Sequence, residues 1–190
     1  ISQRRISGLS ENVSEMGYKA ALGAIEMARW DIETIDLIIL ATSTPNDLFG
    51  SAPEIQSKLG AINAVAFDLT AACSGFLFAA ITATQFLKAG SYKRAVVIGS
   101  DQLSSYVDWN DRRSCILFGD GAGAIAIEGT NKLDNLIGFS MRTDGQRGSF
   151  LNLPSQNNQD LIIDDINFSS GGFSSIKMNG QEVYKFAVRE

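Results

Sequence analysis

The chain has 190 residues, of which 45% are hydrophobic and 19% charged, a composition typical of a globular domain with a sizeable core. Its 16 basic and 21 acidic residues give a formal net charge of −5 with no basic stripe, which argues against a nucleic-acid partner. No apolar run reaches the roughly 18 residues of a membrane span, and no signal peptide opens the sequence. Two cysteines are too few for a disulfide framework, so we expect a cytoplasmic setting.

The sequence contains no histidine, so a Ser-His, Cys-His or zinc-His site cannot be built from this chain alone. It opens without a starting methionine, at "ISQRRIS", and stops inside a helical pattern, "NGQEVYKFAVRE". We therefore expect the chain to be a fragment of a longer protein, truncated at both ends.

The first predicted elements are a helix and a strand. Apolar residues recur at helical spacing over residues 10–30, and Ser10 or Asn12 could cap that helix. The residues expected along one face of this helix are Met16, Ala20, Ala24 and Met27. Residues 35–43 contain a continuous apolar run with β-branched side chains, which indicates a strand buried on both faces.

Helices and strands continue to alternate. A short helix is expected over residues 50–61, with Pro53 in its first turn and Gly60 near its end. Residues 74–90 form a helix that is apolar nearly all round, so it should lie inside the protein. Further buried strands are expected at residues 64–69 and 94–100. This alternation predicts a layered α/β domain whose sheet is covered on both sides.

The last third of the chain is less regular. Residues 121–129 and 136–144 are expected to form strands that run antiparallel to each other. Residues 145–175 are rich in Gly, Ser, Asn and Gln and are expected to form a long excursion. A final helix begins near Gly180. No internal repeat and no linker divides the chain.

Cys73 lies between the strand at 64–69 and the helix at 74–90. The start of a helix has unpaired N–H groups and the positive end of the helix dipole, which favour the thiolate, the nucleophilic form of cysteine. Small neighbours, including Ala72, Ser74 and Gly75, permit a sharp turn and let a substrate carbonyl approach the sulfur. The pattern predicts a nucleophile elbow with cysteine in place of serine. The alternative is a small buried hydrophobe, and Cys115, which lacks this context, is interpreted as structural.

The glycines of "FGDGAGA" are spaced G-x-G-x-G and lead into a strand-like segment, which argues against a dinucleotide site. Gly119, Gly121 and Gly123 are expected to permit close backbone packing, and Asp120 is expected in a turn.

The segments "DLTAACSGFLFAA", "VVIGSD" and "ILFGDGAGAIAIE", in this order and spacing, closely resemble the β-ketoacyl-[acyl-carrier-protein] synthase III family of condensing enzymes. The resemblance runs from "ISQRRI" to "MNGQEVYKFAV". It implies a thiolase-like layered α/β fold with a mixed sheet and a buried helix that carries the nucleophile. Residues 1–190 would be most of the first of two pseudo-symmetric halves.

The same resemblance implies the chemistry. Acetyl-CoA or another acyl-CoA acylates Cys73, and the thioester then condenses with malonyl-acyl carrier protein, which loses CO2. Acyl-CoA is thus a substrate, and neither a cofactor nor a metal is implied. The resemblance further implies a homodimer.

Two loop residues receive roles by resemblance. Arg112, in "DWNDRRSC", matches an arginine that packs against the adenine of CoA, with Arg113 as an adjacent competitor. Phe49, in "PNDLFGSA", matches a phenylalanine that reaches across the dimer and helps to close the neighbouring acyl pocket. From the residues alone, Arg112 would lie in a solvated connection and Phe49 would anchor its loop to the core.

The segment "KMNGQEVYKF" resembles the lining of the pantetheine tunnel, with Met178, Gly180 and Tyr184 at the matching positions. Gly180 would let the cofactor arm pass close to the backbone. The alternative is a glycine at a helix start with Tyr184 in the core.

One departure from the family pattern stands out. The family's cysteine works with a histidine and an asparagine from the second half, and this chain has no histidine. We therefore expect that these residues cannot complete the condensation alone. A sister thiolase-fold enzyme, such as a 3-hydroxy-3-methylglutaryl-CoA synthase or a polyketide-type synthase, would share the elbow cysteine. A non-catalytic dimerisation scaffold is the alternative from another class.

Overall fold

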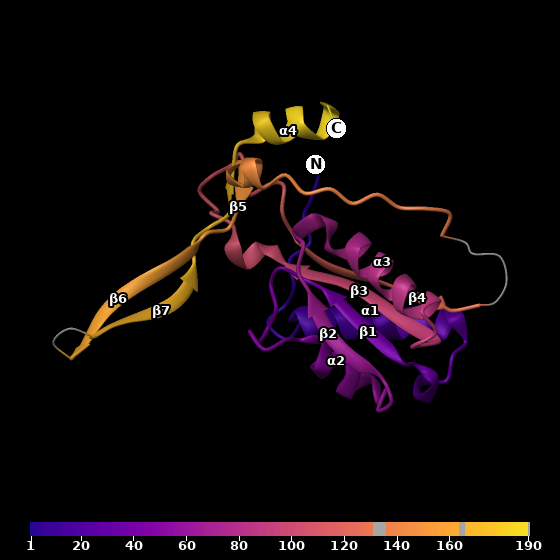
Figure 1. The fold of residues 1–190 in the computed structure, drawn as a ribbon. Coiled ribbons are helices and arrows are strands. Elements are labelled where there is room, and N and C mark those ends of the chain that lie inside the picture. Colours follow the sequence, from indigo (N-terminus) through magenta and orange to yellow (C-terminus); the bar gives the residue numbers. More distant parts are fainter. Residues whose placement is uncertain (131–135, 164–165, 190) are drawn as a thin grey trace. The chain divides into compact units, whose positions relative to one another are not determined.

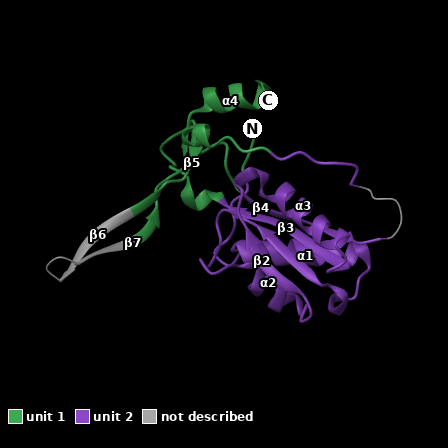
Figure 2. Cartoon of the chain, in the orientation of Figure 1, with its two compact units in different colours: residues 1–4, 103–119, 142–190 green, residues 5–102, 120–141 purple. Residues whose placement is uncertain are grey.

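The computed structural model describes residues 1–130, 136–163 and 166–189, including the side chains of all of these except 157–163 and 166–170 (Figure 1). The chain forms two compact units (Figure 2). The larger unit contains Arg5–Gln102 and Asp120–Met141, and the smaller unit contains Ile1–Arg4, Leu103–Gly119 and Arg142–Glu190.

A mixed sheet with strand order β2-β1-β3-β4 forms the centre of the larger unit. β1 (Leu37–Ala41) pairs in parallel with β2 (Val65–Leu69) on one side and with β3 (Arg94–Gln102) on the other. β4 (Asp120–Glu128) pairs antiparallel to β3. Every residue of β1 is buried, as the apolar run predicted. The strand expected at 64–69 exists, but it lies at the sheet edge and is only partly buried because it has one neighbour.

Helices cover both faces of this sheet (Figure 1). α1 (Val13–Ala28) and α2 (Ala52–Leu59) pack with Ile38 and Leu40 of β1. α3 (Gly75–Lys88) packs on the opposite face, with Leu37 and Ile39. Alternate β1 side chains therefore enter two separate cores, which is why this strand is apolar throughout.

The predicted faces of two helices require correction. Asn12 caps α1 by accepting a hydrogen bond from the Glu15 N–H (2.9 Å), as one of the two expected caps. The buried side of α1 is made by Val13, Ser14, Gly17, Ala21 and Ile25, whereas Met27 is 87% exposed. Small residues such as Gly17 and Ala21 lie on the buried side because they let α1 approach the sheet closely.

α3 is not buried all round. Only one stripe of α3 is buried, made by Gly75, Ala79, Ala83 and Leu87. Leu77, away from this stripe, is 65% exposed. In the described chain, a sheet packs against only one side of α3. The helix therefore has more apolar side chains than the described residues bury.

The segment after β4 also differs from the expectation. β4 pairs with β3, and residues 136–144 contain no strand, so the predicted antiparallel pair is wrong. The segment has the alternation of a strand in Ile137, Phe139 and Met141, but these side chains are exposed. An alternating pattern does not by itself provide a strand to pair with.

The glycine-rich start of β4 also differs in part from the expectation. A Cβ atom at Gly121 or Gly123 would meet nothing within 4 Å, so these glycines do not mark close packing. Asp120 is the first residue of β4 rather than part of a turn. Its carboxylate accepts hydrogen bonds from the Ser7 backbone N–H (2.8 Å) and hydroxyl (2.9 Å).

The smaller unit replaces the expected excursion with short elements. The two-residue strands β5 (Leu151–Asn152) and β8 (Lys177–Met178) pair antiparallel. Between them, β6 (Ser155–Ile163) and β7 (Ile166–Phe173) form a hairpin. α4 (Gly180–Arg189) is the predicted final helix. The 3-10 helices of the chain are η1 (Ile32–Thr34), η2 (Ala72–Ser74), η3 (Leu103–Tyr106) and η4 (Gly145–Phe150). Within the described ranges, no helix combines the length and the apolar character needed to cross a membrane.

Candidate active site

Cys73 lies at the turn that the sequence predicted. It is the middle residue of η2, which connects β2 directly to α3, and its side chain is exposed. Ala72 beside it has a φ of 46°, a left-handed conformation that costs a residue with a side chain roughly 1–2 kcal/mol. A Cβ atom on Gly75 would lie 3.3 Å from the Ala41 Cβ atom, a tight contact, so glycine favours the close start of α3 against β1. The turn is therefore sharp and holds the thiol at the start of α3.

A carboxylate that the sequence reading missed organises the adjacent loop. Asp101, near the end of β3, accepts hydrogen bonds from the Ser43 N–H (2.7 Å) and the hydroxyls of Thr42 and Thr44 (both 3.2 Å). The Thr42 N–H donates in turn to the Leu69 carbonyl of β2 (3.1 Å). Asp101 thus holds the segment after β1 at the carboxyl edge of the parallel strands, where ligands bind in open α/β sheets.

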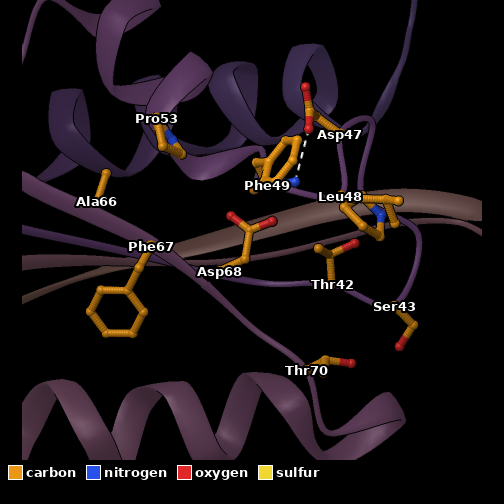
Figure 3. A pocket seen from close by; sticks show the side chains of 12 residues that line it. Thr42, Ser43, Asp47, Leu48, Phe49, Pro53, Ala66, Phe67, Asp68 and Thr70 are labelled. Atoms are coloured by element: carbon orange, nitrogen blue, oxygen red, sulfur yellow. Dashed lines mark hydrogen bonds between the residues drawn. The ribbon is translucent and has the colours of Figure 1, made fainter.

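Phe49 belongs to a loop that borders a pocket of this unit (Figure 3). The pocket is lined by Thr42, Ser43, Pro45, Asp47, Leu48, Phe49, Gly50, Pro53, Ala66, Phe67, Asp68 and Thr70. The Phe49 side chain is 99% exposed, so it does not anchor the loop to the core of the described chain. The pocket is formed by the loop on one side and by β2, the strand that leads to Cys73, on the other.

Arg112 and Arg113 differ in their partners. The Arg113 Nε atom donates to Asp111 (2.9 Å), which lowers the pKa of the Asp111 carboxyl and raises the pKa of Arg113. Arg112 is exposed and makes no hydrogen bond or ion pair with the described part of the chain. Of the two competitors, Arg112 is therefore the one whose guanidinium makes no ion pair with the described residues.

The three tunnel candidates lie close together in the sequence and in the smaller unit. Met178 ends β8 and is half-buried, and Gly180 is the first residue of α4. A Cβ atom on Gly180 would meet only the Met178 Cε atom, at 3.7 Å, an ordinary contact. Tyr184 is 69% exposed, so it does not belong to a core of the described residues.

Cys115 is half-buried, and its backbone N–H donates to the Asp111 carbonyl (3.0 Å). It lies in a turn rather than between a strand and a helix, so it lacks the setting of Cys73. Among the residues that the structure describes, no three His, Cys, Asp or Glu side chains are grouped closely enough to hold a metal ion.

Sequence comparison identifies relatives over the whole chain. Residues 67–145, which include Cys73, match the family described as 3-oxoacyl-[acyl-carrier-protein] synthase III. The chain is 98% identical over 190 residues to the β-ketoacyl-[acyl-carrier-protein] synthase III of Prochlorococcus marinus subsp. pastoris. That match covers 100% of this chain and 57% of the relative, so the chain spans little more than half the length of that protein.

Solved structures agree with the sequence comparison. The 3-oxoacyl-[acyl-carrier-protein] synthase III of Aquifex aeolicus is 34% identical with a TM-score of 0.73, over 96% of this chain and 54% of that one. A priming β-ketosynthase from a polyketide biosynthetic pathway is 28% identical with a TM-score of 0.81, over 98% of this chain and 55% of that one. The thiolase-like α/β fold expected from the sequence is thereby confirmed.

Proposed function

On the premise that this chain belongs to the β-ketoacyl-[acyl-carrier-protein] synthase III family, we propose that the protein containing it starts type II fatty-acid synthesis. In the proposed reaction, an acyl-CoA and malonyl-acyl carrier protein give 3-oxoacyl-acyl carrier protein, CoA and CO2. One observation carries the proposal. Cys73 is an exposed thiol at a sharp turn before α3, inside the segment that matches the family.

The first step is acyl transfer. The Cys73 thiolate attacks the thioester carbonyl of acyl-CoA, the carbon–sulfur bond to CoA breaks, and CoA leaves as a thiolate. The negative charge on the carbonyl oxygen in the transition state needs stabilisation by N–H donors, and the positive end of the α3 dipole lies beside Cys73. A thiol suits this role because it is both a good nucleophile and a fair leaving group.

The second step forms the carbon–carbon bond. Malonyl-acyl carrier protein loses CO2, and the resulting carbanion attacks the acyl carbon on Cys73. The Cys73 thiolate then leaves, which restores the free enzyme and releases 3-oxoacyl-acyl carrier protein. Decarboxylation needs hydrogen-bond donors for the developing enolate oxygen, and the family supplies them from a histidine and an asparagine.

Substrate recognition is assigned to the smaller unit. Arg112 would stack on the adenine of CoA, because its guanidinium is exposed and not engaged by Asp111. Met178, Gly180 and Tyr184 would line the path of the pantetheine arm. The proposal also includes a cytoplasmic homodimer in which Phe49, exposed at its loop, helps to close the partner's acyl pocket.

The test is intact-mass analysis with peptide mapping of the longer protein after exposure to acetyl-CoA. We expect one acetyl group on Cys73 that is lost when malonyl-acyl carrier protein is added. The matched controls are Cys73→Ala, which should take no acetyl group, and Cys115→Ala, which should behave as the parent. Failure of Cys73 to take acetyl or longer acyl groups would overturn the proposal and favour the scaffold.

A polyketide-type priming synthase is the second candidate, favoured by the structural similarity to the priming β-ketosynthase. The same assay separates the candidates if the acetylated protein is offered different second substrates. Discharge by a polyketide carrier protein charged with malonyl, but not by the fatty-acid carrier protein, would favour the priming synthase. Discharge by acetoacetyl-CoA alone would indicate a 3-hydroxy-3-methylglutaryl-CoA synthase.

A further inference from the structure

Asp68 connects the strand of the nucleophile to the loop of Phe49. It lies on β2, five positions before Cys73, opposite Leu40 of the central strand. Its two carboxylate oxygens accept hydrogen bonds from the backbone N–H groups of Ser51 (2.8 Å) and Ala52 (2.6 Å). These residues are the N-cap and the first residue of α2, directly after the loop.

The Asp68 carboxylate caps the N-terminus of α2, a role that a residue next to the helix usually has. The Ser51 side chain makes no capping hydrogen bond to α2, and its hydroxyl instead accepts from the Asn46 N–H (2.9 Å). The first N–H groups of a helix need acceptors, and a carboxylate there is favoured by the helix dipole. The cap therefore comes from another element, so the position of the loop end depends on β2.

The backbone of the loop fits this arrangement. Gly50 has a φ of +113°, which strains any residue with a side chain, and a Cβ atom there would lie 3.5 Å from the Asp68 Oδ1 atom. The Phe49 N–H donates to the Asp47 carboxylate (2.8 Å), so the tip is held by a short turn. Figure 3 shows the Asp68 carboxylate directed towards the segment that carries Phe49.

The other end of the loop is held by α1. The Asn46 side chain accepts from the Val13 N–H (3.1 Å) and donates to the Ser14 hydroxyl (2.6 Å). Both ends of the loop are thus fixed to the larger unit, while Leu48 and Phe49 between them are 89% and 99% exposed. Such exposed apolar side chains on a fixed backbone suit a surface that contributes to a pocket.

We propose that Asp68 is a positioning residue that fixes the Phe49 loop relative to the nucleophile strand and thereby sets which acyl groups the enzyme prefers. The inference rests on the proposed function, in which Phe49 helps to close the acyl pocket. Asp68 acts through the loop and not on the substrate, so its loss changes the discrimination between acyl chains more than the acylation of Cys73 itself.

The test compares Asp68→Ala and Asp68→Asn in the longer protein, and Asp36→Asn is the matched control. Asp36 also accepts two backbone N–H groups, from Lys93 (2.7 Å) and Arg94 (3.0 Å), but it precedes β1 at the opposite end of the strands. The readout is the ratio of kcat/KM for acetyl-CoA to that for octanoyl-CoA. Hydrogen exchange at the Ser51 and Ala52 amides reports the loop independently of activity.

In Asp68→Ala we expect the ratio of kcat/KM for acetyl-CoA to that for octanoyl-CoA to change at least fivefold, towards one. The Ser51 and Ala52 amides should exchange at least tenfold faster than in the parent. Asp68→Asn keeps one acceptor oxygen and should lie in between, and Asp36→Asn should change the ratio less than twofold. An unchanged ratio in Asp68→Ala would overturn the specificity role. If the parent protein takes no acyl group, the proposed function fails. The positioning role is still tested by hydrogen exchange, and unchanged exchange of the Ser51 and Ala52 amides in Asp68→Ala would overturn it.

Discussion

The left-handed conformation of Ala72 is the local feature that most constrains the thiol beside it. A β-branched residue is strongly disfavoured there, so Ala72→Val should lower the free energy of unfolding by about 1–2 kcal/mol. It should also slow acylation of Cys73 by acetyl-CoA, because relief of the strain turns the thiol away from the start of α3. Urea unfolding and the rate of acetylation measure the two effects.

The control is Ala89→Val, the same change at the other end of α3. Ala89 is also exposed, but its φ of −68° is ordinary for an L-residue. We expect a change of about 0.5 kcal/mol or less and an unaltered acetylation rate. Equal losses in both variants would mean that the conformation of Ala72 is not what matters.

Individual residues differ in how far the sequence could reveal them. The turn at Cys73 could be predicted because a strand, a run of small residues and a helix follow one another along the chain. Asp68 and Asp101 could not, because their partners are N–H and hydroxyl groups 16–17 and 57–59 positions away. A carboxylate that binds a distant backbone leaves no local pattern, and only the fold brings the two together.

At the scale of elements, the two faces of α3 differ sharply in burial. Ala83 is fully buried in the stripe that packs on the sheet, whereas Leu77 is 65% exposed. Ala83→Leu should therefore cost about 1–3 kcal/mol of unfolding free energy through overpacking. Leu77→Ala should cost about 0.5 kcal/mol or less in the 190-residue chain. Urea unfolding of both variants tests the assignment, and the reverse order would show that the buried stripe is wrong.

A second prediction concerns the contact between α1 and α2. The pKa of Glu54 is lowered from its ordinary value of 4.5 by the nearby Ser14 hydroxyl, by Lys58, whose Nζ atom lies 3.3 Å from the carboxylate, and by Asn46, whose amide donates to it (3.4 Å). Removing either Ser14 or Lys58 should therefore raise this pKa. We expect a higher Glu54 pKa in Ser14→Ala and in Lys58→Met than in the parent, as measured by NMR titration of the Glu54 carboxyl.

The sign of the pH dependence follows from that shift. Because the folded pKa of Glu54 is depressed, its contribution to stability is complete above the unfolded value near 4.5. It is lost as the pH falls through the folded pKa. The contribution is small because the Glu54 side chain is 43% exposed and such pairs are screened. An unchanged Glu54 pKa in both variants would show that neither group lowers it.

A helix or strand could be predicted where its pattern of apolar residues reflects burial within this chain. β1 is apolar because both of its faces enter a core, and its existence and burial followed from the sequence. Residues 136–144 have the alternation of a strand, but β4 pairs with β3. Alternation records which side chains share a face and does not say whether a partner strand is present.

For the whole molecule, the decisive fact is which groups this chain contains. It has the proposed nucleophile, Cys73, but no histidine, and it spans 57% of the length of its Prochlorococcus marinus relative. Acyl transfer needs only the thiolate and N–H donors, whereas decarboxylation also needs donors for the enolate oxygen. Loss of one such donor typically costs about 10²–10³ in rate.

We therefore expect the purified 190-residue chain to form at least about a thousandfold less 3-oxoacyl product than the longer protein under the same conditions. Acylation and condensation are measured separately, by intact mass and by release of CO2 from labelled malonyl-acyl carrier protein. Circular dichroism first establishes that the purified chain is folded, with both helix and strand content. Condensation at a rate near that of the longer protein would show that this chain supplies its own donors and that the family's histidine is dispensable.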